Sequence, residues 1–517
     1  MKKSTQTIIS LATALVLGAA LTLAFAPFNI FPLGIIAPAG LFALLLNKSP
    51  ARAFWLGFMF GLGLYSTGVY WVFISIHYFG DMPYALAGLI TIGLIAVNAL
   101  FPAATCYYTN RYFLATSAIQ FNFAFAAIWV FSEWVRSWFF SGFTWMDIGY
   151  SQIDTPLKGY APLMSVYSLS LAALVTSTLL VYAVQHYRQN HFRRMYYELL
   201  SIFLIWMTGA LLALIPWTSP TQKTLKVSLV QGDIPQSVKW VPEYLTLSLD
   251  RYSSLSKPLW GKTDLIVWPE AAIPNTLQNS ADFIDSLDSK ARASNTPLLL
   301  GIPIQNENED GYYNAIVALG TQYQVYIKRR LVPFGEYVPF KPFITKLFGP
   351  DSVLVPMSMV PGKRMQKPFY INGISILPSI CYEITFPELI RTLDKNVGIL
   401  LTVTNDAWFG KSSAQAQHLQ MAQMRAIEMG RPVIFSSNNG ITALINAKGI
   451  IETSAPQYQP YVITGIVQPM YGMTPWMKNG TDPILVILIA LLITARRSSK
   501  KVAALKHKND FVLETKI

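Results

Sequence analysis

Cysteine is rare in this 517-residue chain, which contains two, and one of them lies in the stretch PSICYEITFP, residues 378–387. The apolar run before Cys381 predicts a strand, and the residues after it have helical spacing. Such a junction presents a nucleophile at a sheet edge, where a helix N-terminus would lower the pKa of the thiol. A free cysteine is also commonly a small buried hydrophobic residue, so position alone leaves a catalytic and a structural interpretation open.

A catalytic cysteine needs a base, and histidine is its usual partner. Of the five histidines, only His418 falls in the same region of the chain, on the helical pattern AQHLQMAQMRAIE. A surface or packing role is the simpler interpretation of this histidine, so we expect the base to be a carboxylate. Glu270 is a candidate because it ends LIVWPEAAIP, where apolar neighbours would raise its pKa towards that of a useful base.

A cation near the thiol would stabilise both a thiolate and a developing oxyanion. Lys328, in YIKRRLVPFGEYVPF, follows another predicted strand, and Glu336 comes shortly after it. Taken singly, Glu270 and Lys328 are more simply read as solvated charges at strand ends. A catalytic interpretation therefore depends on these residues occurring together.

The elements that position these residues belong to a chain with the composition of a membrane protein. Hydrophobic residues make up 52% of it and charged residues only 13%. An eighth apolar segment, 484–495, is short and is followed by Arg496 and Arg497. The other seven precede residue 218, and most are long enough to cross a bilayer: 8–26, 29–46, 53–76, 83–106, 119–140, 160–185 and 198–217.

Basic residues in the short loops predict the topology of these spans. With a cytoplasmic N-terminus, the cytoplasmic loops carry most of the Lys and Arg residues, and the opposite loops hold only Arg136 and Lys158. The pattern predicts seven transmembrane helices in residues 1–217, an extracytoplasmic domain in 218–482, and an eighth helix with a basic cytoplasmic tail in 483–517. The first segment offers no clean cleavage site, so we expect it to be retained. The basic excess is explained by topology, and nucleic acid is not an expected partner.

The predicted extracytoplasmic domain alternates strand and helix patterns, which indicates an α/β sandwich with mixed sheets. Helices are expected over 244–257, 281–294 and 416–430. Strands are expected over 224–233, 263–272, 296–305, 313–320, 324–335, 373–383, 396–406, 431–451 and 461–469.

Three phrases occur in order along this domain: WPEAAIP, KRRLVPFGEYVP and SICYE. Together they resemble the nitrilase superfamily with its Glu-Lys-Cys triad. The chain is still more similar to the apolipoprotein N-acyltransferase family, over essentially its whole length, through the further phrases VQGDIPQSVKW, TNDAWFG and MRAIEMGRPVIFSSNNG. The resemblance implies an α-β-β-α sandwich inserted between the last two of about eight transmembrane helices of a bacterial inner-membrane protein, with the sandwich in the periplasm.

The same resemblance implies roles for individual residues. Glu270 would be the general base, Lys328 the oxyanion-stabilising cation and Cys381 the nucleophile. Supporting positions would be Glu336, which orients Lys328, then Tyr382 and Glu383, which shape the pocket, and Trp240 and Asn314.

The reaction implied is the last step of lipoprotein maturation. A phospholipid would donate an acyl chain to Cys381 as a thioester, and the N-terminal amine of a diacylglyceryl apolipoprotein would accept it, in a protein expected to act as a monomer. Absence of CxxC, HExxH and phosphate-loop motifs implies no metal and no cofactor. The proline-punctuated segment 340–362, with its apolar side chains, is either a packed loop or a mobile arm that admits acyl chains.

Two other functions remain compatible with the sequence. A membrane-tethered nitrilase-type amidase would share the triad and hydrolyse its thioester. A non-enzymatic membrane protein, such as a transporter or a lipoprotein-binding factor, would have lost the activity.

Overall fold

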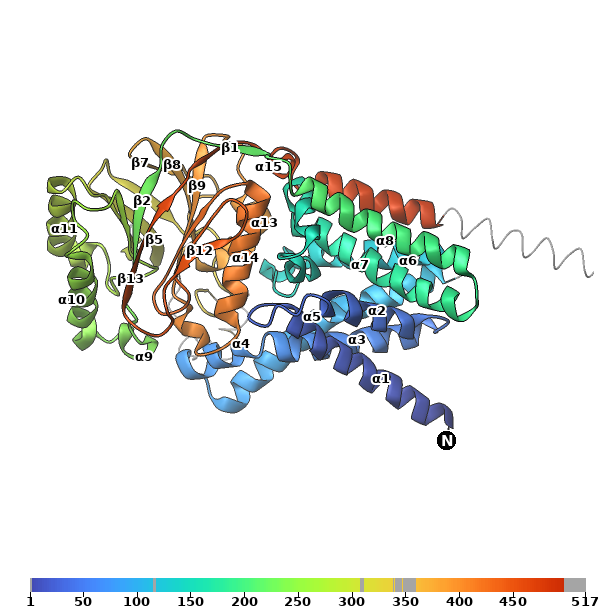
Figure 1. Ribbon diagram of the computed structural model, residues 1–517. Coiled ribbons are helices and arrows are strands. Elements are labelled where there is room, and N and C mark those ends of the chain that lie inside the picture. Colours follow the sequence, from blue (N-terminus) through green and yellow to red (C-terminus); the bar gives the residue numbers. More distant parts are fainter. Residues whose placement is uncertain are drawn as a thin grey trace, which may run out of the picture. The chain divides into compact units, whose positions relative to one another are not determined.

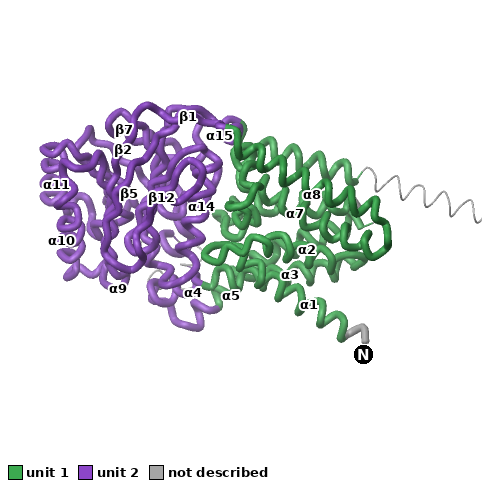
Figure 2. Tube along the Cα trace, viewed as in Figure 1, with its two compact units in different colours: residues 1–70, 89–215, 479–517 green, residues 71–88, 216–478 purple. Residues whose placement is uncertain are grey.

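The computed structural model describes residues 2–114, 118–306, 311–337 and 359–496, together with the single residues 339 and 346. The chain separates into two compact units (Figure 2). The first combines Met1–Tyr70, Leu89–Ile215 and Asn479–Ile517, and the second combines Trp71–Gly88 and Pro216–Lys478.

The first unit is built from apolar helices. They are α1 (Lys2–Leu21), α2 (Leu33–Leu45), α3 (Pro50–Gly68), α5 (Tyr84–Phe113, whose first turns belong to the second unit), α6 (Ala118–Arg136), α7 (Ala161–Arg188), α8 (Phe192–Leu212) and a last helix over 482–496. Within the described residues, four helices are long and apolar enough to cross a membrane, or five if one bent pair counts as a single span. The prediction of about eight spans thus goes beyond what these lengths support. Predicted span 29–46 is reduced to α2, because its helix begins only after Pro32.

Two six-stranded sheets form the centre of the second unit (Figure 1). One has the order β13-β2-β3-β4-β5-β6, with β2 (Leu225–Gln231), β3 (Leu265–Val267), β4 (Leu298–Gln305), β5 (Tyr312–Leu319), β6 (Gln324–Ile327) and β13 (Tyr461–Val467). The other has the order β12-β11-β10-β9-β8-β7, with β7 (Phe369–Ile371), β8 (Ile374–Ile380), β9 (Val397–Thr404), β10 (Val433–Ser437), β11 (Ala443–Ile445) and β12 (Ile451–Ser454). A short pair, β1 (Thr218–Pro220) and β14 (Met470–Gly472), runs antiparallel beside them.

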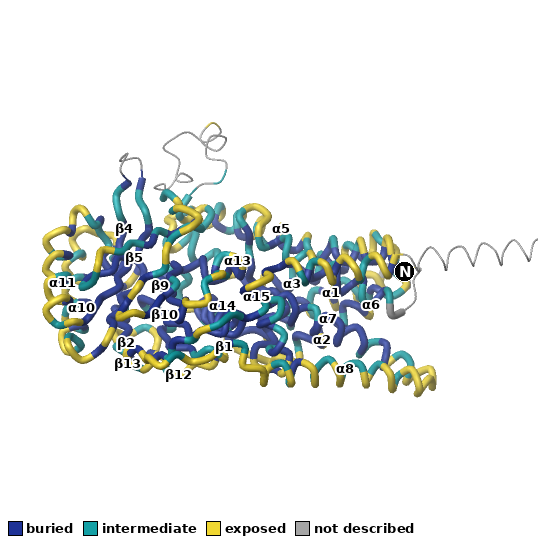
Figure 3. The backbone as a smooth tube through the Cα atoms, turned by 90° about the horizontal axis from the view of Figure 1, so that it is seen from above, coloured by how far each residue is buried: buried dark blue, intermediate teal, exposed yellow. Residues whose placement is uncertain are grey.

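Alternation of side chains along the strands explains why the two sheets pack face to face. In β3, Leu265 and Val267 belong to the core between the sheets, whereas Ile266 packs under the outer helices. Those helices are α10 (Leu245–Ser256) and α11 (Ala281–Ala293), and α14 (Ala414–Met429) covers the other sheet. Figure 3 shows central strands such as β9 and β10 buried and the outward surfaces of α10 and α11 exposed. The predicted sandwich is confirmed as a four-layer α-β-β-α arrangement.

Most predicted elements of the sandwich match, and the differences have local causes. Predicted strand 324–335 ends at Ile327, and predicted strand 431–451 is divided between β10 and β11, which pair antiparallel. The residues after Cys381 do not form one α-helix. They form a short 3₁₀ turn, Cys381–Thr385, and then α13 (Pro387–Ile390), because Pro387 cannot donate to a preceding turn and begins a new helix instead.

Candidate active site

The three residues of the predicted triad follow strands of both sheets, β3 and β6 in one and β8 in the other. Cys381 directly follows β8, Lys328 directly follows β6, and Glu270 comes three residues after β3. All three side chains are buried, and Cys381 has a φ of +50°, in the left-handed region that few residues other than glycine adopt. A strained backbone that projects a side chain from a strand end is typical of a nucleophile elbow.

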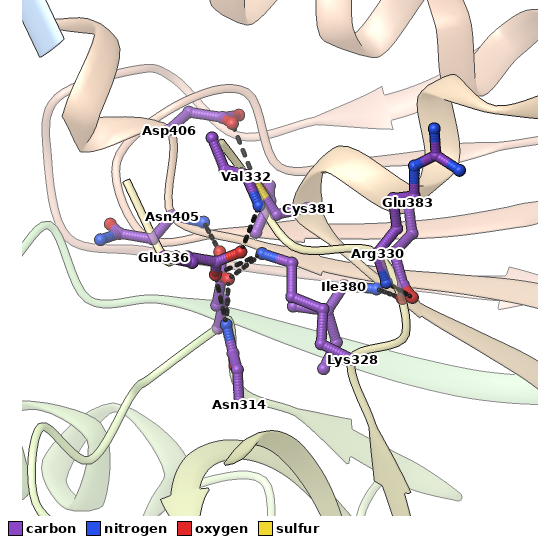
Figure 4. A network of polar contacts seen from close by, with 12 residues as sticks. Asn314, Lys328, Arg330, Val332, Glu336, Ile380, Cys381, Glu383, Asn405 and Asp406 are labelled. Atoms are coloured by element: carbon purple, nitrogen blue, oxygen red, sulfur yellow. Dashed lines mark hydrogen bonds and ion pairs between the residues drawn. The ribbon is translucent and has the colours of Figure 1, made fainter. Parts of the chain in front are cut away.

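Lys328 lies between two carboxylates. Its Nζ is 2.7 Å from Glu336 Oε1 and 3.2 Å from Glu270 Oε1. The Asn314 amide bridges the same two oxygens, with Nδ2 at 2.7 Å from Glu270 and 3.2 Å from Glu336. The Val332 N–H donates to the other oxygen of Glu336 at 2.8 Å. In Figure 4 the Lys328, Asn314 and Glu336 side chains converge on this point, next to Cys381.

The pKa of Glu270 is lower than its usual value, contrary to the expectation from its apolar neighbours. Burial raises this pKa, but the positive charge of Lys328 and the hydrogen bond from Asn314 together lower it by more than burial raises it. The second oxygen, Oε2, accepts a hydrogen bond of 2.8 Å from the N–H of Asn405. Every described contact of this carboxylate is thus with a donor, which holds it in its ionised form.

The thiol of Cys381 has a pKa raised well above its usual value. Burial is the largest cause, the negative charge of Glu270 adds to it, and Lys328 partly opposes both. We expected a helix N-terminus to lower this pKa, but the turn that follows Cys381 is only five residues long. The pKa of Lys328 is raised well above its usual value because two carboxylates outweigh its burial. The resting site therefore combines a protonated thiol with a permanently charged lysine.

Glu383 joins the strand ends that carry Lys328 and Cys381. Its carboxylate accepts from the N–H of Ile380 at 2.8 Å and from the N–H groups of Arg329 at 2.7 Å and Arg330 at 3.2 Å. It therefore fixes the backbone at the ends of both β8 and β6. These hydrogen bonds are the means by which Glu383 would shape the pocket.

The remaining predicted positions differ in how closely they approach this cluster. The ring of Tyr382 is buried and packs edge-on against Phe386 at 4.8 Å. Trp240 is 42% exposed, and its neighbour Lys239 is the residue that contacts Glu270. Segment 340–362, predicted to be a packed loop or a mobile arm, lies outside the described residues up to Ser358, apart from Lys346.

Comparisons with known proteins identify the family of the chain. Residues 17–179 match the family model for the apolipoprotein N-acyltransferase N-terminal domain, and residues 226–474 match the carbon-nitrogen hydrolase model. An apolipoprotein N-acyltransferase of Coxiella burnetii is 41% identical over 93% of this chain and 99% of its own length. The corresponding protein of Azotobacter vinelandii is 39% identical over 95% and 96%. The chain belongs to the apolipoprotein N-acyltransferase family.

Among solved structures, a CN-hydrolase superfamily protein from Xanthomonas campestris is similar to the chain with a TM-score of 0.37 and 20% identity, over 48% of this chain and 91% of that one. Within the described part of the chain, no group of three His, Cys, Asp or Glu side chains could hold a metal ion.

Lys239 was not singled out from the sequence, and the structure places it against Glu270. The side chain is 1% exposed, and its Nζ donates to the main-chain oxygen of Glu270 at 3.2 Å. Burial lowers the pKa of Lys239 to about 7, although Glu270 acts in the opposite direction. The residue follows the phrase QGDIPQSV, and nothing in its spacing distinguishes it from an exposed lysine.

Replacing Lys239 with methionine is expected to change the pH dependence of stability. Because the folded pKa is about 7 and the unfolded one is about 10.5, the unfolded chain binds more protons between these values, and the parent gains stability as pH rises through that window. Between pH 7 and pH 9 the free energy of unfolding of the parent should rise by about 2–3 kcal/mol more than that of Lys239→Met. Thermal unfolding in detergent at pH 6, 7 and 9 measures the difference. If the unfolding temperatures of the two proteins change with pH in the same way, the low pKa of Lys239 is contradicted.

Gly301 on β4 leaves room for the loop that carries Glu270. A Cβ at this position would lie 2.5 Å from the Pro269 oxygen and 2.7 Å from the Glu270 Cα. Gly301→Ala should therefore displace Glu270 and lower the rate of acyl transfer by roughly 10²-fold, as misplacements of about 1 Å do. Gly93→Ala is the matched control, since nothing lies within 4 Å of its added Cβ. Equal rates for the two variants would show that the loop absorbs the extra methyl.

Proposed function

We propose that this protein transfers an acyl chain from a phospholipid to the N-terminal amine of a diacylglyceryl-cysteine on an apolipoprotein. The chain belongs to a family whose curated members carry the name apolipoprotein N-acyltransferase. The observation that carries the proposal is the buried Glu270–Lys328 pair beside a cysteine held in a nucleophile elbow. Such a pair supplies the base and the oxyanion-stabilising cation that acyl transfer through a thioester needs.

The first half-reaction starts from the protonated thiol. Glu270 accepts the proton of Cys381, so a neutral carboxyl group replaces a carboxylate as the thiolate forms, and the total charge beside Lys328 does not change. The thiolate attacks the ester carbonyl of the phospholipid, and Lys328 stabilises the resulting oxyanion. The carbon–oxygen bond then breaks, and the lysophospholipid leaves with the proton held by Glu270.

The second half-reaction transfers the acyl group to nitrogen. The amine of the diacylglyceryl-cysteine attacks the thioester, and Glu270 accepts a proton from it. The carbon–sulfur bond then breaks, and Glu270 passes that proton to the departing sulfur of Cys381, which restores the resting site. An amine attacks a thioester readily. Water would hydrolyse the same thioester, so it must be kept from the acyl-enzyme between the two steps. The product is an apolipoprotein with an amide-linked third acyl chain.

We assign the chain to the bacterial inner membrane as a multi-pass protein. The apolar segments of the sequence and the distribution of basic residues favour seven spans in residues 1–217, a periplasmic catalytic domain in 218–482, and a final span with a cytoplasmic tail in 483–517. Helix lengths in the described residues support four or five of these spans. A lipid donor and a lipid-anchored acceptor both suit a site that operates at a membrane. We propose that the protein acts as a monomer.

Mass spectrometry of the purified protein tests the proposal. The parent and Cys381→Ser are incubated with phosphatidylethanolamine and without an acceptor, and then digested. An acyl-sized adduct on the Cys381 peptide, absent from the variant and discharged by a diacylglyceryl-cysteine peptide, supports acyl transfer. Discharge to water at the same rate with and without that peptide supports the amidase instead. No adduct on folded, lipid-bound parent protein contradicts both.

A further inference from the structure

His418 contacts the peptide group of the nucleophile itself. The ring lies on α14 and is 1% exposed. Its Nε2 is 3.1 Å from the main-chain oxygen of Cys381, and its Nδ1 is 3.0 Å from Asp406 Oδ1. A carbonyl oxygen can only accept, so Nε2 carries a hydrogen and donates it to Cys381. This contact differs from that of a general base, whose free nitrogen would face the thiol.

Asp406 is itself held so that it can orient the ring. Its Oδ1 accepts from Thr404 Oγ1 at 2.8 Å, and its Oδ2 accepts from Ser437 Oγ at 3.3 Å. The Phe435 ring packs edge-on against the imidazole at 5.3 Å. Whether the shared proton resides on Nδ1 or on Oδ1, the Nε2–H is retained and points at the same oxygen. The pair is thus a buried, fixed donor directed at the elbow.

The geometry of a peptide bond links this donor to the chemistry. In a trans peptide the C=O of one residue and the N–H of the next point in opposite directions. Holding the Cys381 oxygen towards His418 therefore directs the Tyr382 N–H away from His418. In an elbow between a strand and a helix, the N–H of the residue after the nucleophile is the donor that stabilises the oxyanion.

We propose that His418, held by Asp406, is a positioning residue that locks the Cys381–Tyr382 peptide with its N–H facing the reacting carbonyl. The strained φ of Cys381 makes such a lock necessary, because a residue in the left-handed region relaxes unless its surroundings hold it. The inference rests on the proposed acyl transfer, and it adds to it the role of His418 and Asp406 in fixing the direction of this peptide group.

Two amide variants test whether a donor at the place of Nε2 is needed. In His418→Asn the amide nitrogen occupies the place of Nδ1 and cannot reach the Cys381 oxygen, whereas in His418→Gln it lies near the place of Nε2. Acyl-enzyme formation from phosphatidylethanolamine should fall by roughly 10²–10³-fold in His418→Asn, the usual effect of losing one oxyanion donor, and by about tenfold or less in His418→Gln. A packing role predicts the same order, because asparagine leaves the larger cavity at this buried position, so a second measurement must separate the two roles.

Alkylation of Cys381 by iodoacetamide is the second measurement. This reaction forms no oxyanion, so both variants should react within about twofold of the parent rate while acyl transfer falls in His418→Asn. Equal acylation by the two variants, or alkylation that falls in parallel with acylation, overturns the inference. A parent that forms no acyl-enzyme contradicts the proposed function instead.

If either variant fails to fold, the imidazole of the parent decides the question. Nitrogen NMR of histidine-labelled protein should show His418 Nε2 protonated throughout the pH range of activity. An unprotonated Nε2 would overturn the inference.

Discussion

Lys328→Met is expected to abolish measurable acyl-enzyme formation and to destabilise the fold. The variant loses the cation that faces the developing oxyanion, which should cost on the order of 10³-fold in rate. It also leaves Glu270 and Glu336 buried, with their Oε1 atoms sharing only the Asn314 amide. Removing one partner from a buried charge pair typically costs about 3–5 kcal/mol.

The stability of Lys328→Met should also depend on pH in a defined direction. Two unneutralised carboxyl groups this close cannot both ionise, so one of them acquires a raised pKa in the folded variant. The folded state then takes up a proton, and its stability is recovered at low pH and lost as pH rises through the raised pKa. The deficit in unfolding temperature relative to the parent should therefore be smaller at pH 5 than at pH 8.

The matched control is Lys448→Met, which removes an exposed lysine from the hairpin between β11 and β12. It should match the parent in acyl-enzyme formation, measured as lysophospholipid release, and in unfolding temperature. If Lys328→Met keeps acylation within about tenfold of the parent, then Lys328 is not the oxyanion donor that the proposal requires.

The sequence allowed the catalytic domain to be predicted in some detail because its signals are local. Strands such as β4 and β5 are short apolar runs, and the structure places them within two residues of their predicted ends, whereas β3 keeps only Leu265–Val267 of the predicted 263–272. The spans were harder, since hydropathy does not distinguish a helix that crosses a bilayer from a shorter one such as α2.

The site was predictable as a set of residue types but not as an electrostatic environment. Motif order indicated Glu270, Lys328 and Cys381, yet we expected the pKa of Glu270 to be raised and that of Cys381 to be lowered. Both directions were wrong, because each depends on which charges lie across the sheet ends and how deeply the groups are buried. Lys239 was not singled out and His418 was interpreted as a surface or packing residue, because their partners are a main-chain oxygen of Glu270 and one of Cys381. Main-chain contacts leave no signature in the sequence.

Glu270→Gln is expected to separate the acidity of the thiol from catalysis. The substitution removes the base, which should lower acyl-enzyme formation by about 10²–10⁴-fold. It also removes a negative charge that raises the pKa of Cys381, so the thiol of the variant should ionise at lower pH than that of the parent. Alkylation by iodoacetamide, followed against pH, should shift its midpoint to lower pH even as acyl transfer is lost.

The same variant has a structural cost that can be anticipated. Both oxygens of Glu270 accept hydrogen bonds, Oε1 from Asn314 and Lys328 and Oε2 from the N–H of Asn405. A glutamine must direct its amide hydrogens at one of these donors, which should cost about 1–3 kcal/mol. Glu243→Gln, on an exposed turn, is the matched control and should leave rate, alkylation midpoint and stability unchanged. An alkylation midpoint that moves to higher pH in Glu270→Gln would mean that Glu270 lowers the pKa of the thiol by stabilising the thiolate. Glu270 would then not act on Cys381 as proposed.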